Sequence, residues 1–316
     1  MSPLTVYDPP LGEDPAGEVR VVRDRGQLRA DLDRLGVDAA VVFTGRLLGT
    51  ATRPDAGYPT GIARVYNRYL RERWLDPAEG IYGALMVAPQ DPRASAEEIE
   101  QYAGVEGIAA VYLPTASVNP LWGHRRYDPI FAAAQAAGLP VVVHGYTQVH
   151  PVFPYQLEQF DTALAKQALA KPLGAAVNLV SMVTTGVLAR FPDLRIVFAE
   201  AGVWWLPGVL WRLDHQWQFL RHEVPFYEQK PSEYIRRQVY FTLQPLEGPD
   251  DSGALVALLD ALGAPERALF ATDWPHYDAE QVERILGLAM PDDWKRRILG
   301  ENARAAFRLP RLAKRR

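Results

Sequence analysis

Short apolar runs alternate with longer amphipathic stretches along nearly the whole chain. A run of apolar, often β-branched residues predicts a buried strand, and apolar positions repeated every three or four residues predict a helix. Strands are predicted at residues 38–43, 81–87, 108–113, 141–144, 194–200, 239–243 and 268–273. Helices are predicted at residues 28–35, 65–74, 96–102, 130–137, 157–190, 203–220, 254–262 and 293–307, with a break in the longest of them near Pro172.

The order of these elements predicts one parallel sheet covered by helices. Seven strand-then-helix units follow one another without a linker, so residues 1–316 are expected to form a single domain. They fit an α/β fold of the (β/α)8 TIM-barrel class whose first strand is absent or degenerate, with residues 1–27 as an irregular N-terminal segment. The alternative is an open doubly wound sheet. If that sheet bound nucleotides it would carry a Gly-rich phosphate loop, and the chain has no such motif.

Composition narrows the class of protein. Apolar residues make up 48% and charged residues 23%, as in a globular protein, and the net charge of −4 gives no sign of a nucleic-acid partner. The absence of cysteine excludes disulfides, thiolate metal sites and a cysteine nucleophile. No long apolar run and no signal-peptide pattern is found, so we expect a cytoplasmic protein with no membrane partner. On the helix at 203–220, Trp204, Trp211 and His215 share a face apart from the apolar stripe, which predicts a homodimer.

Three of the predicted strands end in ionisable residues. Such residues at the carboxyl ends of parallel strands lie where the active site of an α/β barrel is found. His144 follows three valines and could bind a metal or carry protons, unless it is a hydrogen-bonded structural histidine. Glu200 could act as a general base, unless it pairs with an arginine such as Arg212. Asp273 could be a metal ligand or a proton acceptor, unless it caps the next helix.

Other candidates lie in loops. His276 follows Asp273 by three residues and could reach the same pocket as an acid or base, or pack beside Pro275. Trp274, in the same loop, offers a flat apolar surface to a substrate. Arg125 and Arg126 could hold a substrate carboxylate by two parallel hydrogen bonds, although solvated surface arginines are the other interpretation.

Several segments together resemble the amidohydrolase-related family (amidohydrolase 2) that includes aminocarboxymuconate semialdehyde decarboxylase. They cover about residues 28–307 in the right order and are specific for the family, not for a substrate. The segments are residues 31–38, 63–67, 141–145, 206–207, 211–214, 272–276 and 301–304. The resemblance implies a TIM barrel with one divalent metal, zinc or manganese, held in part by His144 and Asp273. It also implies hydrolysis or decarboxylation of a small, often aromatic or unsaturated acid.

The chain departs from this family at the metal site. The family carries a His-x-His pair on its first strand, and no histidine precedes His124 here; Glu200 stands where the family often has a histidine. A catalytic zinc site typically has three protein ligands. Three explanations stay open: Glu200, His276 or Asp8 completes the set, a strand precedes the given start, or the site works without metal. As given, the chain is expected to bind zinc or manganese weakly or in less than one-to-one amount.

The sequence therefore predicts an enzyme, a hydrolase or non-oxidative decarboxylase of a small carboxylated substrate that is aromatic or unsaturated. Glu200, His276 and Asp273 are the predicted catalytic residues, and His144 and Asp273 the predicted metal ligands. Two alternatives remain: a metal-free acid–base enzyme (a cyclase, dehydratase or isomerase) and a non-catalytic barrel used for binding. Three ionisable residues at three strand ends would be costly in a barrel with no chemistry to perform.

Overall fold

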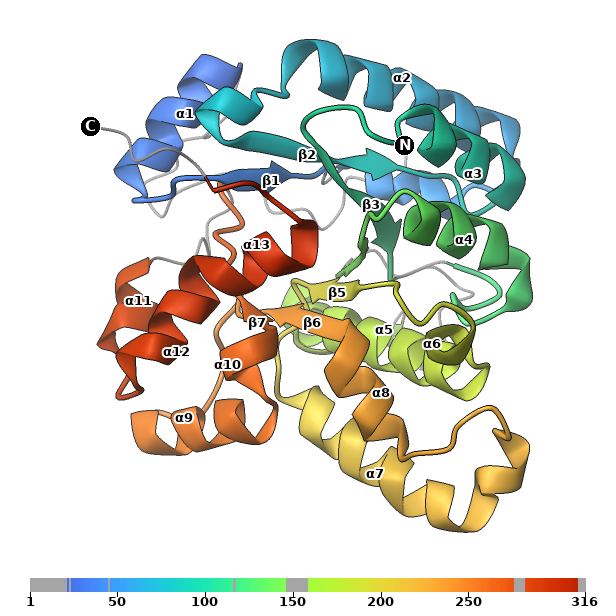
Figure 1. Ribbon diagram of the computed structural model, residues 1–316, viewed down its shortest axis with the longest axis vertical. Coiled ribbons are helices and arrows are strands. Elements are labelled where there is room, and N and C mark those ends of the chain that lie inside the picture. Colours follow the sequence, from blue (N-terminus) through green and yellow to red (C-terminus); the bar gives the residue numbers. More distant parts are fainter. Residues whose placement is uncertain are drawn as a thin grey trace.

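Seven parallel strands form one curled sheet in the computed structural model, which describes residues 22, 24–44, 46–115, 118–145, 159–275 and 282–311. Each strand pairs with the next one along the chain, as expected when a helix follows every strand (Figure 1). The strands are β1 Ala40–Val42, β2 Ile81–Met86, β3 Ile108–Pro114, β4 Val141–His144, β5 Ile196–Ala199, β6 Val239–Thr242 and β7 Ala268–Leu269. Within the described residues no ladder joins β1 to β7. The predicted α/β barrel class is confirmed, and the segment expected to hold an absent or degenerate first strand lies largely outside the described residues.

Helices cover the convex side of this sheet (Figure 1). Several begin at the capping residues that sequence rules favour: Asp24, Asp91 and Asp251 each accept a hydrogen bond from a backbone N–H two or three residues later. The helices are α1 Arg25–Arg34, α2 Gly57–Arg73, α3 Pro92–Gln101, α4 Asp128–Ala136, α5 Ala163–Thr184, α6 Val187–Arg190, α7 Trp205–Leu220, α8 Pro231–Gln238, α9 Ser252–Ala261, α10 Ala264–Arg267, α11 Val282–Gly287, α12 Asp292–Arg296 and α13 Asn302–Phe307. None of these helices is long and apolar enough to cross a bilayer.

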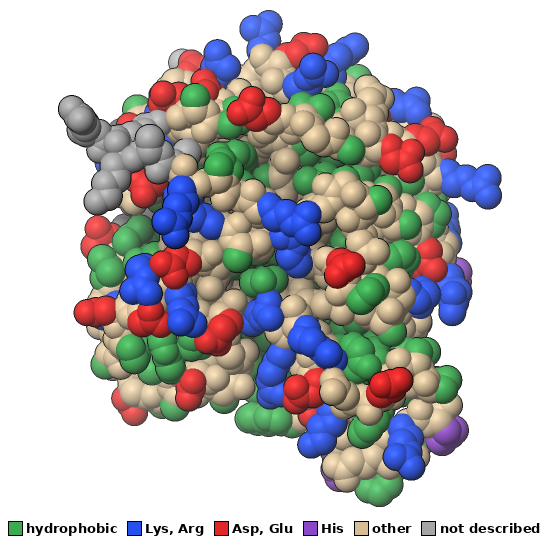
Figure 2. Space-filling model, in the orientation of Figure 1, with side chains coloured by type: hydrophobic (Ala, Val, Ile, Leu, Met, Phe, Trp, Pro, Cys, Tyr) green, Lys and Arg blue, Asp and Glu red, His purple; other side chains and the backbone are tan. Residues whose placement is uncertain are grey.

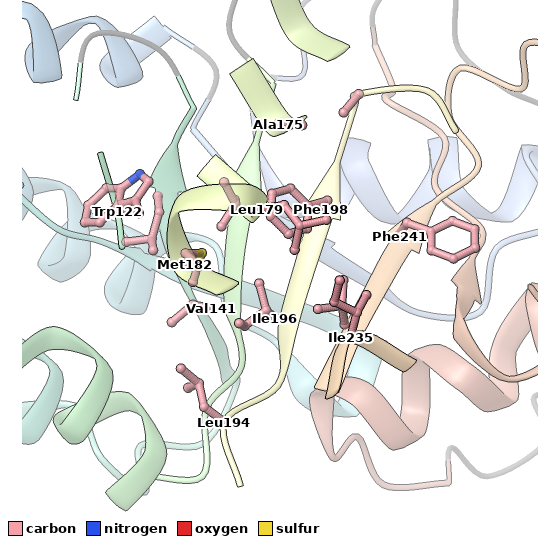
Figure 3. Packing of buried hydrophobic residues seen from close by; sticks show 14 of the residues in the cluster. Trp122, Val141, Ala175, Leu179, Met182, Leu194, Ile196, Phe198, Ile235 and Phe241 are labelled. Carbon is pink, nitrogen blue, oxygen red and sulfur yellow. The ribbon is translucent and has the colours of Figure 1, made fainter. Parts of the chain in front are cut away.

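The predicted break near Pro172 is wrong, because α5 continues through this residue. Proline removes one backbone hydrogen bond from a helix interior and strains the preceding turn. The helix survives because its inner face is firmly buried: Ala175, Leu179 and Met182 are all fully shielded and pack against the sheet (Figure 3). Packing of this face outweighs the local preference of the sequence.

Alternate strand residues separate into two apolar layers, as the twofold period of a strand requires. Val141 and Val143 join the large cluster between sheet and helices, together with Ile196 and Phe198 (Figure 3). Residues of the opposite parity form a smaller cluster on the concave face of the curled sheet. This cluster contains Ala84, Ala110, Tyr112, Val142, Val197, Ala199, Tyr240 and Leu269. A side chain at position 144 has the parity of Val142 and therefore points to the concave face.

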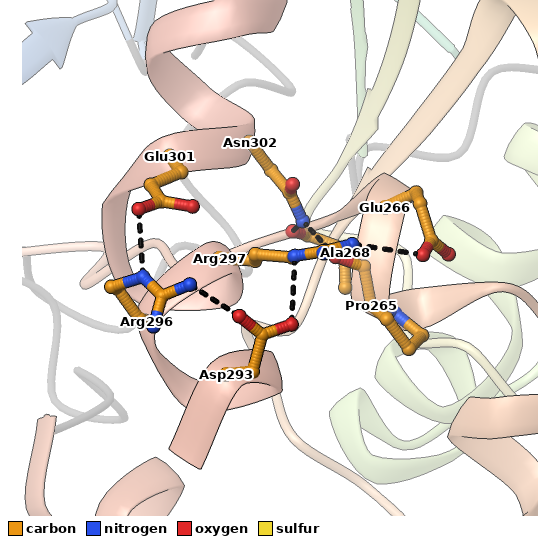
Figure 4. A network of polar contacts seen from close by, with 8 residues as sticks. All are labelled: Pro265, Glu266, Ala268, Asp293, Arg296, Arg297, Glu301 and Asn302. Carbon is orange, nitrogen blue, oxygen red and sulfur yellow. Dashed lines mark hydrogen bonds and ion pairs between the residues drawn. The ribbon is translucent and has the colours of Figure 1, made fainter. Parts of the chain in front are cut away.

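The segment around α12 and α13 is tied to the end of the sheet by polar contacts (Figure 4). The buried amide of Asn302 donates to the carbonyl oxygens of Pro265 at 3.1 Å and Ala268 at 2.9 Å, at the entry to β7. Arg297, in the π-helical stretch Arg297–Glu301, pairs with Glu266 at 3.1 Å. These contacts give residues 301–304, a segment of the family resemblance, a structural role. On the face drawn in Figure 2, side chains of both charges are interspersed.

Candidate functional site

His144 ends β4 on the concave face of the sheet. Its strand lies between β3 and β5, with Pro114 and Ala199 as the neighbouring residues in register. Two aromatic rings flank the imidazole: Tyr112 at 5.1 Å between ring centroids in an edge-on arrangement, and Phe43 at 6.0 Å. Phe43 and Tyr112 are themselves stacked at 5.0 Å. The imidazole thus stands beside an apolar aromatic wall that suits a flat molecule.

Both ring nitrogens of His144 lie close to oxygen atoms. A backbone carbonyl only accepts hydrogen bonds, so Nδ1 of His144, 2.7 Å from the carbonyl oxygen of Gly145, carries a hydrogen. In a neutral imidazole, Nε2 would then be a bare acceptor, and it lies 3.2 Å from Oε2 of Glu200. A hydrogen bond between these two atoms needs a proton on Nε2 or on the carboxyl group. With that proton in place, the pair has the geometry of a general acid.

Lys171, on α5, contacts the other carboxylate oxygen of Glu200 through its ammonium group. The three side chains are largely shielded from water: 8% of Glu200, 13% of His144 and 19% of Lys171 is exposed. Solvent and salt therefore screen their interactions far less than those of surface ion pairs. One carboxylate between two nitrogen groups makes a compact cluster, which we call the His144–Glu200–Lys171 cluster.

The backbone of Glu200 is held in an uncommon conformation, with φ of +53°. A glutamate in the left-handed region costs free energy, and such residues persist where surrounding contacts hold them. Its N–H donates to Oγ1 of Thr242 at 3.1 Å. Gly145 permits the close approach of the two strand ends, because a Cβ atom there would lie 2.2 Å from the carbonyl oxygen of Glu200. The backbone geometry at Glu200 thus sets the direction of its side chain.

Asp273 shares this unusual backbone, with φ of +56°. β7 ends at Leu269, so Asp273 lies four residues beyond the strand and not at its tip as predicted. Its Oδ2 accepts a hydrogen bond from Nε2 of the buried Gln244 at 3.2 Å. Gln244 follows β6, the strand between those that lead to Glu200 and Asp273.

A further carboxylate, Glu247, lies in the loop after β6. Desolvation raises the pKa of Glu247, and the positive charge of Lys171 lowers it in part. A Cβ atom on Gly202 would lie 2.4 Å from Oε2 of Glu247, so this carboxylate stands directly against the backbone just after Glu200. The field of Lys171 therefore reaches two carboxylates that follow adjacent strands.

The other predicted site residues make different contacts. Arg126 donates to the carbonyl oxygen of Gln90 at 3.2 Å and, like Arg125, is exposed. Among the described residues neither arginine contacts His144 or Glu200. Both arginines lie in the segment of the chain between β3 and α4 (Figure 1).

The indole of Trp274 is bound to the first helix. Its Nε1 donates to Oδ2 of Asp31 at 3.2 Å, and the guanidinium of Arg34 stacks 5.0 Å from its ring. These contacts link the loop after β7 to α1 across the sequence. His276 and Asp8 lie outside the described residues.

Sequence reasoning missed Lys171, Gln244 and Glu247. It also named the wrong partner for Glu200, because Arg212 is exposed and Lys171 takes its place. One signal was available for Lys171: it and Lys166 are the sole charged residues in the largely apolar 22-residue helix α5. A charged residue on a helix whose faces are mostly buried needs a partner. Nothing in the sequence indicates which residue, 29 positions away, that partner is.

Comparisons with known proteins identify relatives. The sequence model of a family described as amidohydrolase matches residues 19–309. The 6-methylsalicylic acid decarboxylase of Penicillium expansum is 23% identical over 300 residues, which cover 90% of this chain and 86% of that protein. The crystal structure of 5-carboxyvanillate decarboxylase from Sphingomonas paucimobilis matches with a TM-score of 0.72 and 25% identity, over 92% of this chain and 84% of that one.

A dihydroxybenzoic acid decarboxylase from Polaromonas sp. JS666 has a similar fold, with a TM-score of 0.70 and 21% identity over 93% of this chain and 88% of that one. Its crystal structure contains manganese and the inhibitor 2-nitroresorcinol. A divalent metal, predicted from the family resemblance, is thus present in a structural relative.

The described residues of this chain do not fit such a metal. They contain no group of three or more His, Cys, Asp or Glu side chains able to hold one, and two candidates for completing the set, His276 and Asp8, lie outside them. One oxygen of Glu200 is in contact with the ammonium of Lys171, and Oδ2 of Asp273 accepts a hydrogen bond from Gln244. A divalent cation bound to Glu200 would also be repelled by that ammonium.

Proposed function

Because the chain belongs to the amidohydrolase family, whose model matches residues 19–309, we propose that it is a non-oxidative decarboxylase of a small aromatic carboxylic acid. The family and the enzyme class, predicted from the sequence, are confirmed by the relatives, which are decarboxylases. The observation that carries the proposal is the shielded contact of 3.2 Å between Nε2 of His144 and Oε2 of Glu200, a pair that can hold and donate a proton. Decarboxylation of an aromatic acid consumes one proton, and this pair can supply it.

The proposed reaction begins with protonation of the ring carbon that bears the carboxylate. The proton comes from the His144–Glu200 pair, which lies beside the aromatic wall of Phe43 and Tyr112. The bond between ring and carboxylate then breaks, its electron pair returns to the ring, and carbon dioxide leaves. The pair regains its proton from water. A ring hydroxyl next to the carboxylate, as in 6-methylsalicylic acid, stabilises the protonated ring.

Asp273 has a secondary role in this proposal. Its carboxylate, oriented by Gln244, would accept a hydrogen bond from a hydroxyl group of the substrate. We also propose that His276 acts as an acid or base and that Trp274 contacts the substrate. Arg125 and Arg126 would serve only if the loop that carries them moves towards the site.

A panel of aromatic acids tests the reaction. The panel contains 6-methylsalicylate, 5-carboxyvanillate and 2,6-dihydroxybenzoate, and the measurements are released carbon dioxide and the decarboxylated phenol. We expect at least one acid to give both products in equal amounts. Turnover of amide or ester substrates, with no carbon dioxide from any acid, would show that the chain is a hydrolase instead.

The exposed face of α7 supports the predicted homodimer. Trp211 is 66% exposed and Phe219 65%, and with His215 they recur every four residues, so they lie on one face of the helix. The rings of His215 and Phe219 are in contact at 5.5 Å. Large exposed aromatic side chains are enriched in protein interfaces. Light scattering should give a dimer for the wild type and a monomer for Trp211→Glu; a monomeric wild type would contradict the proposal.

A further inference from the structure

We propose that Lys171 is the cation that binds the carboxylate of the substrate, so that the site takes up an aromatic acid without a divalent metal. This inference rests on the proposed decarboxylase function and adds to it the group that recognises the acid. It begins from the disagreement between the described ligand set and a metal site. Neither the sequence analysis nor the family resemblance named this lysine.

The first argument is position. Lys171 contacts Oε1 of Glu200, and His144 contacts Oε2 of the same carboxylate, so proton source and cation are separated only by Glu200. Decarboxylation needs the acid held so that its ring carbon, one bond from the carboxylate, meets the proton. A cation next to the proton source can hold the carboxylate in that place.

The second argument is charge. Lys171 is the basic member of the cluster, and its field reaches the carboxylates of Glu200 and Glu247. In a site shielded from water, a lysine ammonium attracts an anion more strongly than it does at the surface. The charge of Lys171 can therefore hold a substrate carboxylate beside the His144–Glu200 contact.

The third argument is cost. A lysine and a glutamate removed from water seldom add stability, because desolvation offsets their attraction. Here the glutamate is also kept in a left-handed backbone conformation. The free-energy cost of burying this pair on the concave face, beside the aromatic wall, is explained if the pair binds an anionic ligand.

The test compares two ligands of nearly equal size, benzoate and neutral benzyl alcohol. Benzoate lacks the ring hydroxyl that assists ring protonation, so it should bind without reacting. Dissociation constants are measured by NMR titration of full-length, chelator-treated protein. For the wild type we expect benzoate to bind more tightly than benzyl alcohol, and addition of Mn²⁺ to leave both constants unchanged.

Substitutions locate this preference. Lys171→Met should weaken benzoate binding by about tenfold or more, the loss of a charge-assisted hydrogen bond, and leave benzyl alcohol unaffected. Lys171→Arg should keep part of the preference. Lys166→Met removes the same charge from the same helix five residues earlier and is the matched control; it should bind like the wild type. If Lys171→Met fails to fold, the double variant Lys171→Met/Glu200→Gln removes both charges and should also lose the preference.

Two results would overturn the inference. One is an unchanged preference for benzoate in the folded Lys171→Met or double variant. The other is a chelator-treated wild type that shows no preference until Mn²⁺ is added, which would assign the carboxylate to a metal. Neither result depends on turnover, so a failure of the inference is distinct from a failure of the decarboxylase proposal, which the panel of acids tests.

Discussion

Two clusters of charged side chains in this molecule differ in nearly every physical respect. The His144–Glu200–Lys171 cluster lies on the concave face of the sheet, with at most 19% of any side chain exposed. The cluster of Asp293, Arg296, Arg297 and Glu301 lies around α12 and is 38–59% exposed (Figure 4). The exposed cluster has more ion pairs, yet surface pairs contribute little and are screened by salt. Burial, not the number of contacts, is what makes the His144–Glu200–Lys171 cluster the candidate site.

Loss of the histidine should have the largest effect. His144→Gln keeps a polar side chain of similar length but has no proton to transfer. We expect kcat to fall by about 10²- to 10⁴-fold, the usual contribution of general acid catalysis. The melting temperature, measured by circular dichroism, should show that the variant is folded. A variant with wild-type kcat would remove His144 from the mechanism.

Glu200→Gln should reduce both activity and stability. It leaves the ammonium of Lys171 without its carboxylate in a shielded position, and such unpaired groups cost up to about 3–5 kcal/mol, less here because Lys171 is partly exposed. Urea unfolding measures the loss. Lys171→Met/Glu200→Gln should recover part of the stability and none of the activity. A single variant as stable as the wild type would mean that the ion pair is not formed in solution.

Asp273→Asn separates function from structure. The amide oxygen of asparagine can still accept the hydrogen bond from Gln244, so stability should change by less than about 1 kcal/mol. If the charge of Asp273 orients a substrate hydroxyl, kcat/KM should fall by about tenfold to a hundredfold, the worth of a hydrogen bond to a charged group. Unchanged kinetics on every substrate would exclude a role for this carboxylate.

A substitution in the exposed cluster should have the smallest effect on stability and activity. Arg296→Ala removes contacts to Asp293 and Glu301, and we expect only a small loss of stability, one that disappears at high salt. Activity should not change. A larger, salt-independent loss of stability would show that exposure does not distinguish the two clusters as described.

The fold was largely predictable and the site only in part. Periodicity located all seven strands, because buried parallel strands are continuous apolar runs such as Val141–His144. It failed at Pro172, where packing overrides a local preference, and at residues 270–273, which leave the sheet after Leu269. The sequence placed His144 and Glu200 at strand ends, where the structure also has them, and their roles stay predictions. Lys171 was not, because its contact with Glu200 spans 29 residues and arises only when α5 packs on the sheet.

The central claim is that the His144–Glu200 pair delivers a proton to the ring carbon that loses its carboxylate. The direct measurement is turnover of the accepted aromatic acid in D₂O, with analysis of the phenol by NMR. The account predicts one deuterium per product molecule, at the position vacated by the carboxylate, and greatly slowed formation of this product by His144→Gln. Carbon dioxide release that proceeds at the wild-type rate in that variant, or no deuterium at the vacated carbon, would contradict it.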